Sequence, residues 1–155
     1  MIPENFKEAL KLILQRLEGK QIDWAVYGSA NLALQGLDLI PNDIDIITDK
    51  QGAFLFDEVF DDFVVKKAEY FENEEYKAFK ASYHIEGVRV DVIGDLHQKN
   101  PAGDLWTETQ GFKARMYFML DGYELPVITL EQEFFAYNKL GKKEKAVMIK
   151  KQLDG

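Results

Sequence analysis

The chain has 155 residues, a mass of 17.9 kDa, a formal net charge of −8 at pH 7 and no cysteine. The acidic balance argues against broad nucleic-acid binding, and the lack of both a signal-peptide pattern and an apolar run of roughly 18 residues argues against a membrane partner. We therefore expect a cytoplasmic, single-domain protein over residues 1–155, with a motif core at about 20–96 followed by a hairpin and helices at about 97–155.

The N-terminal segment, residues 3–18, is predicted to form an amphipathic helix. Phe6, Leu10, Ile13 and Leu17 recur at helical spacing and form one apolar stripe. We expect this stripe to pack on a sheet.

A short apolar run at residues 24–27 predicts a buried strand, and Gly28 and Ser29 then open a segment rich in alanine and leucine that predicts a helix. Glycine permits a sharp turn, and the first amide groups of a helix have no intrahelical partners. We expect Ser29 to lie at the helix N-cap, where its hydroxyl either caps the helix or contacts an anion. A phosphate group would suit this turn.

Two aspartates lie on the next predicted strand. The 13 residues from 30 to 42 allow a two-turn helix and a return loop, after which Asp43 and Asp45 project from one face of the strand and Ile44 and Ile46 from the other. Like charges held this close repel each other unless a cation lies between them. Hard divalent cations such as Mg²⁺ are bound by carboxylates together with substrate phosphates.

The middle of the chain supplies a third carboxylate. The elements predicted there are a helix at 52–60, a strand at 63–65, a loop at 69–75 and a hairpin at 76–93 that turns at Glu86-Gly87. If the second arm of the hairpin lies beside the Asp43 strand, Asp91 joins Asp43 and Asp45. Arg89 shares the face of Asp91, and we expect it to pair with an aspartate rather than to contact substrate.

The C-terminal third is predicted to contain a hairpin and two helices. The elements are a loop at 94–111 with Trp106 against the core, strands at 115–120 and 124–128 that turn at Asp121-Gly122, a helix capped by Thr129 and Gln132, and a last helix after Gly141.

The order of these motifs resembles the signature of the DNA polymerase beta superfamily of nucleotidyltransferases, in its minimal, stand-alone form. The resemblance rests on Tyr27-Gly28-Ser29, on Asp43-Ile44-Asp45-Ile46 and on Asp91 as the third carboxylate. It implies an α/β (α+β) fold with a mixed, partly antiparallel sheet of about five strands flanked by helices.

The resemblance also implies an activity. The protein would transfer a nucleoside monophosphate from a nucleoside triphosphate to an acceptor hydroxyl, and the acceptor stays open among a small molecule, a protein side chain and an RNA end. Asp43, Asp45 and Asp91 would bind two Mg²⁺ or Mn²⁺ ions and act in catalysis. Gly28 and Ser29 would hold the phosphates of the nucleotide.

The C-terminal lysines match the family only loosely. Lys139, with Lys142, Lys143 and Lys145, is similar to a basic segment that lies near the nucleotide in several small members, and it either reaches a phosphate or is solvated. Two alternatives to the enzyme remain. One is a nucleotide-binding or antitoxin-like protein that acts through a protein partner, and the other is a structural domain that binds no metal.

Overall fold

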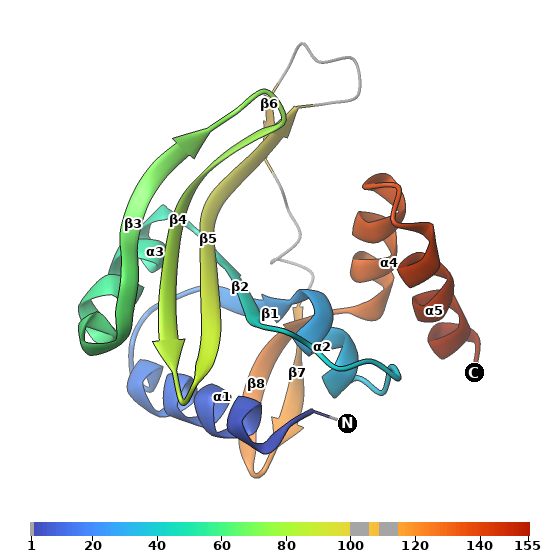
Figure 1. The fold of residues 1–155 in the computed structure, drawn as a ribbon, viewed down its shortest axis with the longest axis horizontal. Coiled ribbons are helices and arrows are strands. Elements are labelled where there is room, and N and C mark those ends of the chain that lie inside the picture. Colours follow the sequence, from blue (N-terminus) through green and yellow to red (C-terminus); the bar gives the residue numbers. More distant parts are fainter. Residues whose placement is uncertain (1, 100–105, 109–114) are drawn as a thin grey trace.

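A single mixed sheet forms the centre of the computed structural model, which describes residues 2–99, 106–108 and 115–155 (Figure 1). Within these ranges the sheet has eight strands in the order β3-β4-β5-β2-β1-β8-β7, with β6 paired to β5 outside this path. The strands are β1 (Trp24–Tyr27), β2 (Ile44–Thr48), β3 (Val64–Glu72), β4 (Tyr76–Ile85), β5 (Val88–Lys99), β6 (Trp106–Glu108), β7 (Arg115–Leu120) and β8 (Tyr123–Ile128).

The mixed α/β class is confirmed, but the expected count of about five strands is wrong. The C-terminal hairpin of β7 and β8 does not form a separate layer, because β8 pairs in parallel with β1 at Val26 and Val127. The short strand β6 adds a further partner to β5. Both additions lengthen the same sheet.

Helices flank this sheet. They are α1 (Glu4–Leu17), α2 (Gly28–Leu34), α3 (Lys50–Val59), a 3-10 turn η1 (Asp61–Phe63), α4 (Leu130–Lys139) and α5 (Lys143–Asp154). The predicted stripe on α1 is buried, and it packs with Phe56 of α3 in the main core. In Figure 1, α4 and α5 lie together, away from α1 and α3. No helix in the described ranges is long and apolar enough to cross a membrane.

The alternation of side chains in β2 separates the core from the carboxylate face. Ile44 and Ile46 are fully buried in the main core. Asp45 points to the other face, where it lies opposite Tyr27 of β1 and Asp91 of β5. Residues directly opposite each other on paired strands share a face, so the sheet presents a polar row across its centre.

Two predicted loops are wrong. β3 continues to Glu72 because Tyr70, Phe71 and Glu72 pair with β4, although the charged sequence there predicts a loop from residue 69. β5 continues to Lys99, past the positive φ of 56° at Asp95, through pairing with β4 and β6. The expected packing of Trp106 concerns a side chain outside the described part of the structure.

The two predicted hairpin turns are confirmed. Glu86 and Gly87 have φ angles of 53° and 75°, and Asp121 and Gly122 have φ angles of 48° and 89°. Two successive residues with positive φ match the right-handed twist of the flanking strands. The first of these turns fixes the β4–β5 register and therefore the position of Asp91.

Candidate active site

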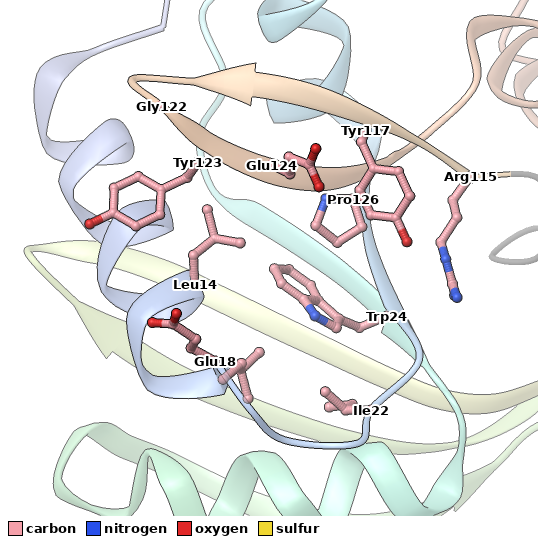
Figure 2. A pocket seen from close by; sticks show the side chains of 11 residues that line it. Leu14, Glu18, Ile22, Trp24, Arg115, Tyr117, Gly122, Tyr123, Glu124 and Pro126 are labelled. Carbon is pink, nitrogen blue, oxygen red and sulfur yellow. The ribbon is translucent and has the colours of Figure 1, made fainter.

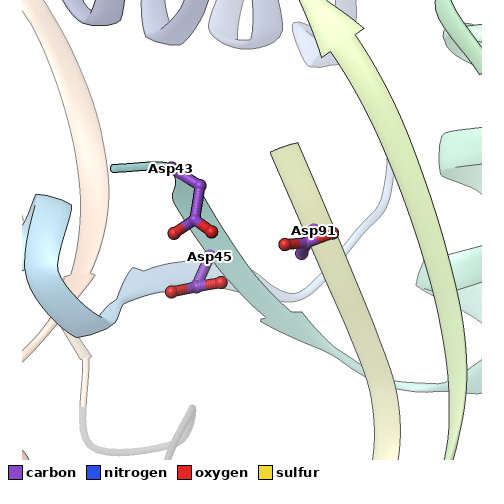
Figure 3. A group of neighbouring side chains, drawn as sticks. All are labelled: Asp43, Asp45 and Asp91. Carbon is purple, nitrogen blue, oxygen red and sulfur yellow. The ribbon is translucent and has the colours of Figure 1, made fainter. Parts of the chain in front are cut away.

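Three aspartates converge on the polar face of the sheet. Asp45 lies on β2, Asp43 directly precedes that strand, and Asp91 lies on β5. The parallel β2–β5 pairing places Asp45 directly opposite Asp91, and Figure 3 shows the three side chains around one space. One oxygen from each residue lies within 4.8 Å of the other two, and all three side chains are half-buried. The sequence-based prediction that these residues meet is confirmed.

Burial and mutual repulsion raise the proton affinity of Asp45 and Asp43. The pKa of Asp45 rises to about 7, first because the side chain is buried and then because Asp43 and Asp91 lie close to it. Burial and the charge of Asp91 also raise the pKa of Asp43. A divalent cation would relieve the same repulsion, and carboxylate oxygens are suitable ligands for Mg²⁺ or Mn²⁺.

Asp91 is held by two neighbours on its own face. The Ser82 hydroxyl donates to Asp91 Oδ1 at 2.8 Å, and Arg89 Nε donates to the same oxygen at 2.9 Å. The expected pairing of Arg89 with an aspartate is confirmed. These bonds orient the carboxylate, while its second oxygen also lies 3.2 Å from Arg89 Nε.

Gly28 brings the end of β1 against Asp45. Its φ is +77°, and a Cβ built at this position would lie 2.9 Å from Asp45 Oδ2. α2 begins at Gly28 itself, and Tyr27 is its N-cap without a side-chain cap bond, so the prediction of Ser29 as the N-cap is wrong. Ser29 lies one residue inside the helix, and its hydroxyl makes no hydrogen bond to the residues that the structure describes.

Glu133 is a site residue that the sequence-based predictions missed. It is 3% exposed, and its Oε2 accepts from the Gly28 amide at 2.7 Å and from Asn31 Nδ2 at 2.8 Å. Burial raises the pKa of Glu133 to about 7 against the opposing effect of these hydrogen bonds. The Gly28 amide is thus already occupied. In the sequence, Glu133 and Glu131 look alike as acidic residues of a first helical turn, and only the fold separates them.

Two cavities adjoin the carboxylates, and Tyr27 and Asp45 line both. The helix-side cavity, of about 260 Å³, lies between the sheet and α4, and besides these two residues its lining includes Gly28, Ile47, Tyr137, Leu140 and Lys142. The strand-side cavity, of about 270 Å³, lies over β4 and β5, and its lining includes Tyr76, Lys80, Ser82, Arg89 and Asp91.

The lysines of α4 and α5 differ in their distance from the site. Lys145 is close enough to Asp45 and Glu133 for its charge to oppose the rise in the pKa of both carboxyl groups. Lys142 lines the helix-side cavity, whereas Lys139 is exposed at the end of α4 and lines a neighbouring hollow. The arrangement favours Lys142 and Lys145 over Lys139 as cations near the carboxylates.

A separate cavity of about 440 Å³ lies between α1, β1 and the β7–β8 hairpin (Figure 2). Trp24, Leu14 and Tyr117 line it, and none of the three aspartates does. It is a hollow beside the core rather than part of the carboxylate site.

Fold and site together define a protein of the nucleotidyltransferase superfamily. A family model described as aminoglycoside-2''-adenylyltransferase matches residues 9–152, so the chain belongs to that family. No curated protein matches the sequence.

Solved structures agree with this assignment. The chain is 34% identical to a candidate nucleotidyltransferase from Thermotoga maritima, with a TM-score of 0.86 over 99% of this chain and 96% of that one. It also shares its fold with the lincosamide antibiotic adenylyltransferase LnuA bound to lincomycin, at 17% identity and a TM-score of 0.60 over 96% and 97% of the two chains. ANT(2'')-Ia in complex with adenylyl-2''-tobramycin is similar at 12% identity, with a TM-score of 0.55 over 93% and 88%.

Proposed function

We propose that this protein is a metal-dependent nucleotidyltransferase, which transfers a nucleoside monophosphate from a nucleoside triphosphate to an acceptor hydroxyl by a two-metal mechanism. The observation that carries the proposal is the convergence of Asp43, Asp45 and Asp91, with one oxygen of each within 4.8 Å of the others, on a nucleotidyltransferase fold. Three carboxylates this close are costly unless cations lie among them.

Each aspartate has a distinct role in the proposal. Asp43 and Asp45 would hold both ions, with Asp91 as a ligand of one of them. When bound, Mg²⁺ or Mn²⁺ supplies charge neutralisation for the phosphates and activates the attacking hydroxyl. Asp91, oriented by Ser82 and Arg89, then receives the proton of that hydroxyl.

The nucleotide would bind on the α2 side of Asp45. The Ser29 hydroxyl has no hydrogen bond within the described residues and is available to a phosphate. The Gly28 amide donates to Glu133 and is therefore not free for a phosphate. Gly28 contributes instead by allowing the backbone to approach Asp45 closely. Lys145 and Lys142 would supply positive charge there, and we place Lys139 further out.

The test is Asp45→Asn, measured by calorimetric titration of nucleoside triphosphates with and without Mg²⁺ and by release of pyrophosphate. The variant removes a ligand together with a repulsive charge, so we expect a folded protein whose metal-dependent transfer falls by about 100-fold or more. The matched control is Asp61→Asn, because Asp61 is exposed on η1. It should bind and react like the wild type.

Either of two results would contradict the proposal. Transfer retained by Asp45→Asn would remove the assigned role of that carboxylate. A folded wild type that binds no nucleoside triphosphate with either metal would instead favour one of the two alternatives, an antitoxin-like protein that acts through a partner or a structural domain that binds no metal.

A further inference from the structure

The strand-side cavity has two cationic side chains beside the carboxylates of Asp45 and Asp91. Lys80 and Arg89 both line it. Ser82 of β4 lies opposite Asp91, and Lys80 lies opposite Ile93, so these β4 side chains share the face that carries the aspartates. Asp45 and Asp91 line the same cavity, and Arg89 is paired with Asp91 at 2.9 Å, so Lys80 is the positive charge that this pairing leaves over.

Lys80 is the cation with no acidic partner. Its Nζ donates to the Tyr76 hydroxyl at 2.9 Å and lies 4.7 Å from the centre of the Phe71 ring. Within the described ranges it forms no ion pair, because Glu69, which lies opposite on β3, is paired with Lys66 at 2.9 Å. Contacts with a hydroxyl and a ring hold the ammonium in place without neutralising it.

The nucleotide does not require Lys80 in this arrangement. The helix-side cavity lies across Asp45 from β4 and has its own cations, with Lys142 in its lining and Lys145 close to Asp45. Its apolar lining, which includes Ile47 and Leu140, suits a nucleobase. The strand-side cavity, next to Asp91, is then left for the acceptor.

We propose that the acceptor is a small hydroxylated molecule that carries a phosphate or carboxylate group, and that Lys80 binds this group. The inference rests on the proposed function. The acceptor hydroxyl attacks the α-phosphorus, the bond from that phosphorus to the bridging oxygen breaks, pyrophosphate leaves, and the hydroxyl proton passes to Asp91. Lys80 takes no part in the chemistry and determines which acceptors bind.

The charge of Lys80 disfavours the polycationic acceptors for which the family is named. An aminoglycoside such as tobramycin carries several ammonium groups, which would meet the ammonium group of Lys80 in this cavity. Placing like charges together is an effective way to reject a ligand.

The test measures acceptor binding to the full chain in the presence of Mg²⁺ and a non-hydrolysable nucleoside triphosphate. The probes are glycerol 3-phosphate and glucose 6-phosphate, glycerate and gluconate, the uncharged glycerol and glucose, and tobramycin. We expect at least one acid to bind about tenfold or more tightly than its uncharged counterpart and than tobramycin. Comparison of the phosphates with the carboxylates identifies the anionic group.

Lys80→Met and Lys66→Met form the matched pair of variants, since both lysines lie on this face and Lys66 has an acidic partner. We expect Lys80→Met to lose about tenfold in affinity for the acid while its affinity for the nucleotide stays within about twofold, and Lys66→Met to retain both. Tobramycin as the tightest ligand, binding of no acid, or loss of nucleotide affinity in Lys80→Met would each overturn the inference. If the wild type binds no nucleotide, the proposed function fails as well, so the two failures are distinguishable.

Discussion

Gly28 meets two requirements at once, a left-handed backbone and close contact with a carboxylate. Its φ of +77° disfavours any side chain, and the position of a Cβ would be 2.9 Å from Asp45 Oδ2. Gly28→Ala therefore has to strain the backbone and displace Asp45. We expect a loss of about 1–3 kcal/mol in the free energy of unfolding. We also expect metal-dependent nucleotide affinity to fall about tenfold, since Asp45 is the proposed ligand.

Gly19→Ala separates the two effects. Gly19 has the same φ of +77° and no atom within 4 Å of a built Cβ. This variant should lose about 1 kcal/mol of stability in urea unfolding and bind the nucleotide like the wild type. Equal nucleotide affinities in the two variants would show that the approach of Gly28 to Asp45 has no role in the site.

At the scale of elements, Glu133 joins α4 to the start of α2. Its carboxylate is the acceptor for both the Gly28 amide and the Asn31 side chain, which are buried. Glu133→Ala leaves two buried donors without that acceptor, and we expect it to cost about 2–4 kcal/mol in the free energy of unfolding. Glu133→Gln retains an acceptor oxygen and should cost less than about 1 kcal/mol. Chemical denaturation measures both, and equal losses would mean that these hydrogen bonds do not hold α4 in place.

The elements that sequence predicts well are those with local signals. Asp121-Gly122 has a turn signature that needs no tertiary information, and the apolar stripe of α1 follows from helical spacing. The aspartate cluster is also predictable, because Asp45 and Asp91 lie on strands whose alternation fixes their faces, and Asp43 directly precedes the strand of Asp45.

The features of the fold and site that sequence does not predict depend on contacts between segments distant in sequence. β3 runs to Glu72 because β4 pairs with it, and its charged residues give no strand signal of their own. Glu133 is identified as a site residue only by its contact with Gly28, 105 positions earlier in the chain. The single sheet has more strands than expected because the β1–β8 pairing is non-local as well.

At the scale of the whole molecule, the buried carboxylates link stability to pH. Asp45 and Glu133 both have a pKa raised to about 7 in the folded state, from 3.8 and 4.5 respectively. Between those limits the folded protein binds more protons than the unfolded chain. The stability of the metal-free protein should therefore fall as the pH rises from about 5 to about 8.

Mg²⁺ should act against this trend, because a cation and protons compete for the same carboxylates. We expect the increase in melting temperature caused by Mg²⁺ to be small at pH 5 and larger at pH 8, where Asp45 is ionised. Asp45→Asn should both flatten the pH dependence of the metal-free protein and reduce the effect of Mg²⁺, whereas Asp61→Asn should change neither. Thermal unfolding at several pH values, with Mg²⁺ or with a chelator, measures the pH dependence of stability and the effect of Mg²⁺ for each variant. A Mg²⁺ effect that is independent of pH would mean that the ion binds away from the three aspartates.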